Sequence, residues 1–200
     1  LTDHINKKQY KFSTNLSGRH NLYNVTAAIC VAIEENISVK DIAKGLANFR
    51  GVGRRFELSE IYFSNHPHVL IDDYGHHPAE ILSTVLAAKE KFPRQKICMI
   101  FEPHRFTRTQ QLFDDFKKVL SRVDFLLLLD IYPASEKPIK GISSKKLASE
   151  IFKKNKNVYY IGKKDPMNWL YENHQEFSIL ITQGAGTISK LNKKIKKKWQ

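Results

Sequence analysis

Two blocks of polar residues contain the side chains best suited to chemistry. The first reads Asp-Asp-Tyr-Gly-His-His-Pro over residues 72–78, and the second reads Pro-His-Arg-Phe-Thr-Arg-Thr over residues 103–109. Each block lies where an apolar, strand-like run gives way to a helix-like pattern, and open α/β sheets bind ligands at such points. The carboxylates, imidazoles and guanidiniums together predict a site for a charged, polar substrate.

In the second block, Arg105 and Arg108 flank the predicted start of a helix. Free backbone N–H groups and the helix dipole favour anions there, and two guanidiniums would complete a receptor for a carboxylate or a phosphate. The alternative is that one of these arginines pairs with Asp114 or Asp115.

In the first block, Asp72 and Asp73 end a predicted strand and point in different directions, so one can bind a ligand while the other braces the loop. The histidines could serve as acid–base groups, substrate donors or metal ligands. A metal site is disfavoured, because the spacing of the four histidines between residues 66 and 77 matches no structural zinc pattern.

Two further pairs suggest nucleotide contacts. Asn21 and Asn24 are three residues apart in a predicted helix, so both amides project from one side, and amides suit an adenine edge or ribose hydroxyls. The alternative is that one of them only caps the helix. Arg54 and Arg55 follow a glycine break and could clamp phosphates; the alternative is one exposed arginine and one interdomain ion pair.

The spacing of apolar side chains predicts the elements that position these residues. We expect a short edge strand over residues 10–16, a helix with Leu22 on its apolar face, and a second helix capped by Ser38. The glycines at 51 and 53 predict a domain boundary near residues 51–57.

Beyond this boundary, short apolar runs alternate with helical patterns. The alternation is typical of an α/β fold, here a Rossmann-like, mostly parallel sheet with helices on both faces, preceded by a small helical remnant. Thr107-x-x-Gln110 predicts a helix cap, and Gly184-Ala185-Gly186 predicts a tight strand-to-helix turn. The predicted strands cover residues 69–71, 97–101, 125–129, 158–161 and 179–181.

The composition excludes a membrane-spanning protein. Of the 200 residues, 42% are hydrophobic and 26% are charged, and no apolar run approaches the roughly 20 residues that span a bilayer. Cys30 and Cys98 lie in apolar periodic segments, which predicts reduced core thiols in a cytosolic protein. Because the chain begins at Leu1 and not at methionine, we expect a piece of a longer protein.

The formal net charge of +13 raises the question of a nucleic-acid partner. Much of this charge comes from lysine runs, which are usually solvated faces, and the lysines are scattered along the chain. A nicotinamide-dependent oxidoreductase would need a glycine fingerprint at its first strand-to-helix turn, with an acidic residue after it. Neither feature occurs, so we expect no dinucleotide partner. Because the lysines are scattered and no apolar run spans a bilayer, we also expect no nucleic-acid or membrane partner.

Taken in order, the motifs resemble those of the Mur ligases from about residue 17 to residue 188. The resemblance implies that residues 1–51 end the central ATPase domain of such a ligase and that residues 52–200 form its C-terminal Rossmann-like domain. It also implies a cytoplasmic enzyme of peptidoglycan synthesis. The motifs are His-Asn-x-x-Asn, Gly-Val-x-Arg-Arg-Phe, Asp-Asp-Tyr-Gly-His-His-Pro, Pro-His-Arg-Phe-Thr-Arg-Thr and Thr-Gln-Gly-Ala-Gly.

Mur ligases use ATP and Mg²⁺ to activate a carboxylate as an acyl phosphate, which an amine then attacks. Within the family, the motifs are most similar to those of enzymes that add L-alanine to UDP-N-acetylmuramate. Ligases that recycle murein tripeptide share the Asp-Asp-x-x-His-His-Pro pattern. No Gly-x-x-x-x-Gly-Lys-[Ser/Thr] loop occurs here, so we expect the magnesium ligands outside this sequence and the chain to be inactive alone.

The resemblance also implies roles for individual residues. Asn21 and Asn24 would contact the adenine and ribose of ATP, and Asp73 would meet ATP once the domains close. Arg55 would be catalytic, because it would stabilise charge on the ATP phosphates. The residues that would hold the L-alanine carboxylate or shape its pocket are Tyr74, His76, His104, Arg105 and Arg108.

Overall fold

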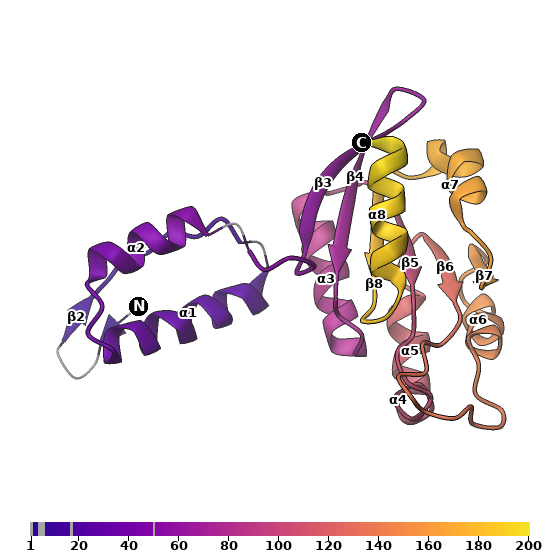
Figure 1. Ribbon diagram of the computed structural model, residues 1–200, viewed down its shortest axis with the longest axis horizontal. Helices are drawn as coiled ribbons and strands as arrows, with labels where there is room; N and C mark the ends of the chain where they lie inside the picture. The colour runs from indigo at the N-terminus through magenta and orange to yellow at the C-terminus, as the bar shows by residue number, and fades with distance from the viewer. Residues whose placement is uncertain (1, 4–6, 17, 50) are drawn as a thin grey trace. The chain divides into compact units, whose positions relative to one another are not determined.

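The computed structural model describes residues 2–3, 7–16, 18–49 and 51–200. The chain divides into two compact units, Leu1–Val52 and Gly53–Gln200, which are drawn in Figure 1. Among the described residues, no helix is both long enough and apolar enough to cross a membrane.

The first unit contains two helices and a short antiparallel strand pair: α1 (Arg19–Glu34), α2 (Val39–Asn48), β1 (Thr2–Asp3) and β2 (Lys8–Gln9). In its small core, Val25 and Ile29 of α1 pack with Ile42 of α2. The Ser38 hydroxyl accepts the Asp41 N–H at 3.1 Å, which confirms the predicted cap of α2.

Three expectations for this unit are wrong. Residues 10–16 form no strand: Phe12 and Leu16 pack against the helices, but the backbone of this segment has no ladder partner among the described residues. Leu22 is 53% exposed, so it lies outside the core. Cys30 is exposed because its neighbour Ile29 faces the core and successive helical positions are about 100° apart.

The second unit is built on a six-stranded sheet in the order β3-β4-β8-β5-β6-β7. Strand β3 runs antiparallel to β4 and all other neighbours are parallel, which confirms the predicted mostly parallel sheet. The strands are β3 (Glu57–Phe63), β4 (His66–Asp73), β5 (Ile97–Phe101), β6 (Phe125–Leu129), β7 (Val158–Gly162) and β8 (Ile179–Gln183).

Strand β3 is absent from the predicted elements. Only Ile61 and Phe63 of this edge strand are fully buried, while Leu58 is 42% exposed, so it lacks the continuous apolar run of the inner strands. Ser64 and Asn65 form the two-residue turn to β4 with φ angles of 48° and 67°. Such a turn between alternating segments is a hairpin signal that could have revealed the strand.

Helices cover both faces of this sheet, as predicted (Figure 1). Helices α3, α5 and α6 pack on one face around Ile71 and Met99, and α7 and α8 pack on the other around Leu70 and Ile100. Inner strands supply both cores because successive side chains point to opposite faces. The helices are α3 (Pro78–Lys91), α4 (Phe106–Gln111), α5 (Phe113–Leu120), α6 (Ser144–Phe152), α7 (Met167–Asn173) and α8 (Ile188–Trp199), with a 3₁₀ turn at His174–Glu176.

The predicted cap at Thr107 is wrong. Arg105 occupies the cap position of α4 with a φ of 73°, and Thr107 lies inside the helix. The Thr107 N–H and hydroxyl donate to the Glu136 carboxylate at 3.0 and 2.6 Å. Glu136 comes from the loop after β6, so a local sequence pattern could not identify it as the partner of this helix start.

Candidate active site

The carboxyl ends of β4, β8 and β5 lie side by side because these strands are parallel neighbours. Asp73 at the end of β4 and Phe101 at the end of β5 both pair in register with Gln183 of β8. Residues 72–78 and 103–109 therefore meet at one edge of the sheet, where open α/β sheets bind ligands.

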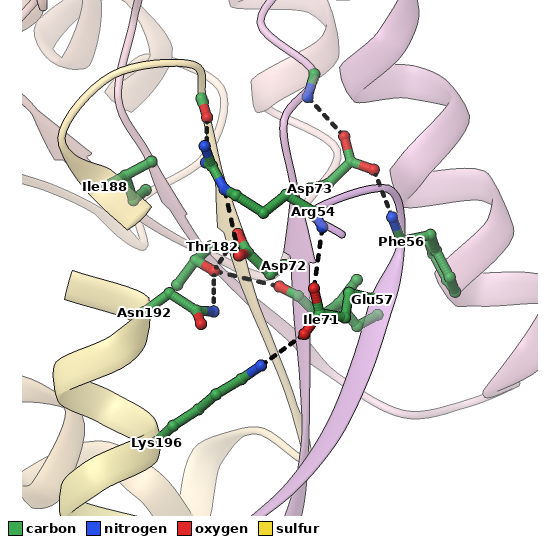
Figure 2. A network of polar contacts seen from close by, with 12 residues as sticks. Arg54, Phe56, Glu57, Ile71, Asp72, Asp73, Thr182, Ile188, Asn192 and Lys196 are labelled. Carbon is green, nitrogen blue, oxygen red and sulfur yellow. Dashed lines mark hydrogen bonds and ion pairs between the residues drawn. The ribbon is translucent and has the colours of Figure 1, made fainter. Parts of the chain in front are cut away.

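Asp72 stabilises the fold at this edge of the sheet. Its buried carboxylate lies 3.3 Å from Arg54 Nε and accepts the Thr182 hydroxyl at 3.2 Å, as Figure 2 shows. Burial raises the pKa of Asp72, and the positive charge of Arg54 opposes that rise. The Asp72 charge therefore depends on Arg54.

Asp73 is also buried, and its carboxylate braces the loop that follows β4. It accepts the N–H groups of Phe56 at 2.9 Å and Gly75 at 2.7 Å, and the Gln183 amide at 3.2 Å. Burial raises the pKa of Asp73, while the two backbone N–H groups act in the opposite direction. These three hydrogen bonds hold the carboxylate against the turn and the loop on either side of it.

The two adjacent arginines have different environments. Arg54 binds Asp72 and donates to the Gly184 carbonyl oxygen at 2.6 Å, so its ion pair lies within the second unit. Arg55 is exposed, and its guanidinium lies 5.6 Å from the centre of the Tyr74 ring. It makes no hydrogen bond or ion pair with the described residues, so it is available to an anion.

Four rings form a continuous row along the edge. The Tyr74 and His76 ring centres are 5.4 Å apart, those of His76 and His104 are 5.2 Å apart, and His104 stacks on Tyr132 at 5.4 Å. Burial lowers the pKa of His104, and the nearby His76 and Arg108 lower it further. These effects on the pKa favour the neutral form of His104.

The guanidinium of Arg108 has a hydrogen-bonding partner among the described residues and that of Arg105 has none, as is the case for Arg54 and Arg55. Arg108 Nη1 lies 3.3 Å from both the ring nitrogen Nδ1 and the carbonyl oxygen of His104. Arg105 is exposed, and its guanidinium makes no hydrogen bond or ion pair with any described residue. Among those residues, no ion pair joins either arginine to Asp114 or Asp115.

Three residues at this edge, Glu80, Tyr132 and Gln183, are not among the predicted site residues. Glu80 accepts the N–H groups of His76 at 2.8 Å and His77 at 3.0 Å, which fixes the loop. Burial acts to raise the pKa of Glu80, but these two N–H groups, together with the charges of His76 and Arg55, lower it overall. The spacing of His77 and Glu80 is a capping-box signal that could have revealed this contact.

Asn21 and Asn24 belong to the first unit. Gly18 is the N-cap of α1, with a φ of 93°, so neither asparagine caps the helix. The side chain of Asn21 is buried and that of Asn24 is exposed. Both lie near the start of α1, as the sequence predicts.

The acidic groups of the described residues do not fit a magnesium site. Nowhere in the described ranges do three or more His, Cys, Asp or Glu side chains come together in a way that could hold a metal ion. Asp72 and Asp73 already bind internal donors. A cavity of about 500 Å³ lies beyond Tyr132, at the ends of β6 and β7 beside the start of α8, and none of the predicted site residues lines it.

Comparison with known proteins agrees with this fold. The chain is similar to UDP-N-acetylmuramate-alanine ligase MurC from Thermotoga maritima, with 24% identity and a TM-score of 0.72 over 96% of this chain and 40% of that one. It is also similar to a murein peptide ligase from Psychrobacter arcticus, with 20% identity and a TM-score of 0.63 over 93% and 38% of the two chains. A folylpolyglutamate synthase from Thermotoga maritima matches at 18% identity and a TM-score of 0.63, over 94% and 41%.

The chain thus spans about two fifths of the length of these structures. At these identities the likeness shows the fold alone. The family model described as "Mur ligase, glutamate ligase domain" matches residues 54–186, which is about two thirds of the chain. The chain therefore belongs to the Mur ligase family.

Proposed function

We propose that this chain is the C-terminal part of a cytoplasmic ligase that uses ATP and Mg²⁺ to join L-alanine to UDP-N-acetylmuramate in peptidoglycan synthesis. Mur ligases are ATP-dependent amide-bond ligases. Residues 1–51 would end the central ATPase domain, and residues 52–200 would be the C-terminal domain. The observation that carries the proposal is the pair of exposed arginines, Arg55 and Arg105, at the carboxyl edge of the sheet.

Arg55 is proposed to meet the ATP phosphates. Its guanidinium has no hydrogen-bonding partner among the described residues and lies against the face of Tyr74, which limits its freedom. A guanidinium held in advance stabilises the charge that develops as the γ-phosphoryl group moves. Asn21 and Asn24 are proposed to contact the adenine and ribose, and Asp73 to support the ATP site through the loop that it braces.

Arg105 is proposed to bind the carboxylate of L-alanine, with Arg108 beside it. A forked guanidinium binds a carboxylate through two parallel hydrogen bonds. His76, His104 and Tyr74 would form the wall of the pocket, because their rings lie in one row beside Arg108. Holding the carboxylate aims the amine at the activated carbonyl and lowers the entropic part of the barrier.

A substrate comparison on the complete ligase tests this proposal. Phosphate release is measured with ATP, Mg²⁺ and UDP-N-acetylmuramate, and with either L-alanine or the murein tripeptide as the amine. Release that depends on L-alanine is expected. Release with the tripeptide alone would instead assign the chain to a recycling ligase, and release with neither amine would reject both assignments.

A further inference from the structure

Arg54 belongs to a closed ring of polar contacts, drawn in Figure 2. Its backbone N–H donates to the Glu57 carboxylate at 2.9 Å, and Glu57 also accepts the Lys196 ammonium at 2.9 Å. On the other side, its guanidinium lies 3.3 Å from Asp72 and donates to the Gly184 carbonyl oxygen at 2.6 Å. One side chain thus joins the ends of β4 and β8.

The ring closes through α8. Thr182 donates its hydroxyl to Asp72 at 3.2 Å and accepts the Asn192 amide at 2.8 Å. Asn192 and Lys196 are one turn apart on α8, so the helix holds both ends of the ring. The turn that contains Arg54 is therefore attached to strands β4 and β8 and, through Glu57, to helix α8 (Figure 2).

These contacts hold the turn in an unfavourable backbone conformation. Arg54 and Phe56 have φ angles of 59° and 53°, in the left-handed region that residues with a side chain rarely adopt. The Phe56 N–H donates to Asp73 at 2.9 Å, and the Tyr74 N–H donates to the Arg54 carbonyl oxygen at 2.7 Å. Such strain persists only where the surroundings maintain it, and it is frequent at ligand-binding sites.

The turn presents Arg55 between its two strained neighbours. The guanidiniums of Arg54 and Arg55 lie 5.3 and 5.6 Å from the centre of the same Tyr74 ring. We propose that Arg54 is a positioning residue, which binds Asp72 and the Gly184 carbonyl and thereby holds the Arg55 guanidinium and the Tyr74 ring at the edge of the sheet. This inference rests on the proposed function, in which Arg55 meets the ATP phosphates.

The kinetic test compares Arg54→Met with Lys196→Met in the complete ligase. Both substitutions remove one cation from the ring, but only the first releases Asp72 and the Gly184 carbonyl. We expect Arg54→Met to lower kcat/KM for ATP at least tenfold, with KM for L-alanine within twofold of wild type. Lys196→Met is expected to leave both values within twofold. Arg54→Lys should recover part of the loss, because a lysine can still pair with Asp72.

An exchange measurement on the 200-residue chain tests the turn itself without requiring activity. We expect Arg54→Met to speed amide hydrogen exchange of Phe56 and Tyr74 at least tenfold, while Ile181 in β8 exchanges as in wild type. Unchanged exchange at Phe56 and Tyr74 would overturn the inference, and so would equal kinetic losses in the two methionine variants. If the wild-type ligase turns over no ATP, the proposed function fails, and the exchange result alone then decides whether Arg54 holds the turn.

Discussion

Substitutions of Arg105 separate an effect on substrate binding from an effect on stability. Its φ of 73° is unfavourable for a residue with a side chain, and its guanidinium makes no hydrogen bond or ion pair with the described residues. The fold therefore gains little from this side chain. We predict that Arg105→Ala and Arg105→Gly both impair L-alanine binding and differ from each other in stability.

The guanidinium of Arg105 determines the expected change in KM, and its backbone conformation determines the expected change in stability. A hydrogen bond to a charged group contributes about 1.5–3 kcal/mol, and 1.4 kcal/mol is about tenfold in affinity. Both variants should therefore raise KM for L-alanine about 10- to 100-fold and leave KM for ATP within about threefold. A left-handed conformation costs a residue with a Cβ about 1–2 kcal/mol, and the greater backbone freedom of unfolded glycine cancels about 0.5–1 kcal/mol. Arg105→Gly should thus be about 1 kcal/mol more stable than Arg105→Ala.

Two assays check this prediction. Steady-state kinetics of the complete ligase give the two KM values. Urea unfolding of the 200-residue chain, followed by tryptophan fluorescence, reports the second unit, because both tryptophans, Trp169 and Trp199, belong to it. Equal increases in KM for ATP and L-alanine would refute the assigned role. A loss of more than about 1 kcal/mol in Arg105→Ala relative to wild type would show that the guanidinium supports the fold.

Three further predictions concern the chain itself. Gly184→Ala should cost at least about 2 kcal/mol in urea unfolding, because its Cβ would lie 2.7 Å from the Glu102 carbonyl oxygen at a φ of 145°; an unchanged midpoint would contradict the described turn. Burial raises the pKa of Asp72 above its ordinary 3.8, so the folded state holds this proton more tightly than the unfolded chain. The stability of wild type relative to Asp72→Asn should therefore fall as pH rises from 3.8 through the raised pKa, and urea midpoints that diverge in the opposite direction would be inconsistent with that shift. A thiol reagent should modify Cys30 in the native chain and Cys98 only after unfolding, because Cys30 is exposed and Cys98 is buried; mass spectrometry after digestion distinguishes the two sites.

The inner strands could be predicted because a parallel strand covered on both faces requires a continuous apolar run. Ile97–Phe101 is buried at every position, and the sequence shows the same run. Strand β3 lies at the edge and exposes Leu58, so its pattern is weaker. In the first unit, Phe12 and Leu16 alternate like strand residues, but a strand also needs a partner for its backbone, which side-chain pattern does not supply.

The convergence of the two polar blocks could also be predicted, since the carboxyl ends of parallel neighbours meet at one edge. The contacts that each side chain makes could not be predicted. The environments of Arg54 and Arg55 differ because Gly184, 130 residues from Arg54, supplies an acceptor for only one of them. Asp73 is likewise occupied by Gln183, 110 residues away. Adjacent identical residues carry no local signal for such long-range contacts.

In the proposed ligase, Arg55 serves phosphoryl transfer and Arg105 binds the amino acid. Positional isotope exchange in labelled ATP, measured in the complete ligase with UDP-N-acetylmuramate but without L-alanine, reports acyl phosphate formation separately from amide formation. We predict that Arg55→Met abolishes this exchange and that Arg105→Ala retains it while losing ligation. Exchange that survives in Arg55→Met, or that disappears in Arg105→Ala, would contradict the division of roles between the two arginines.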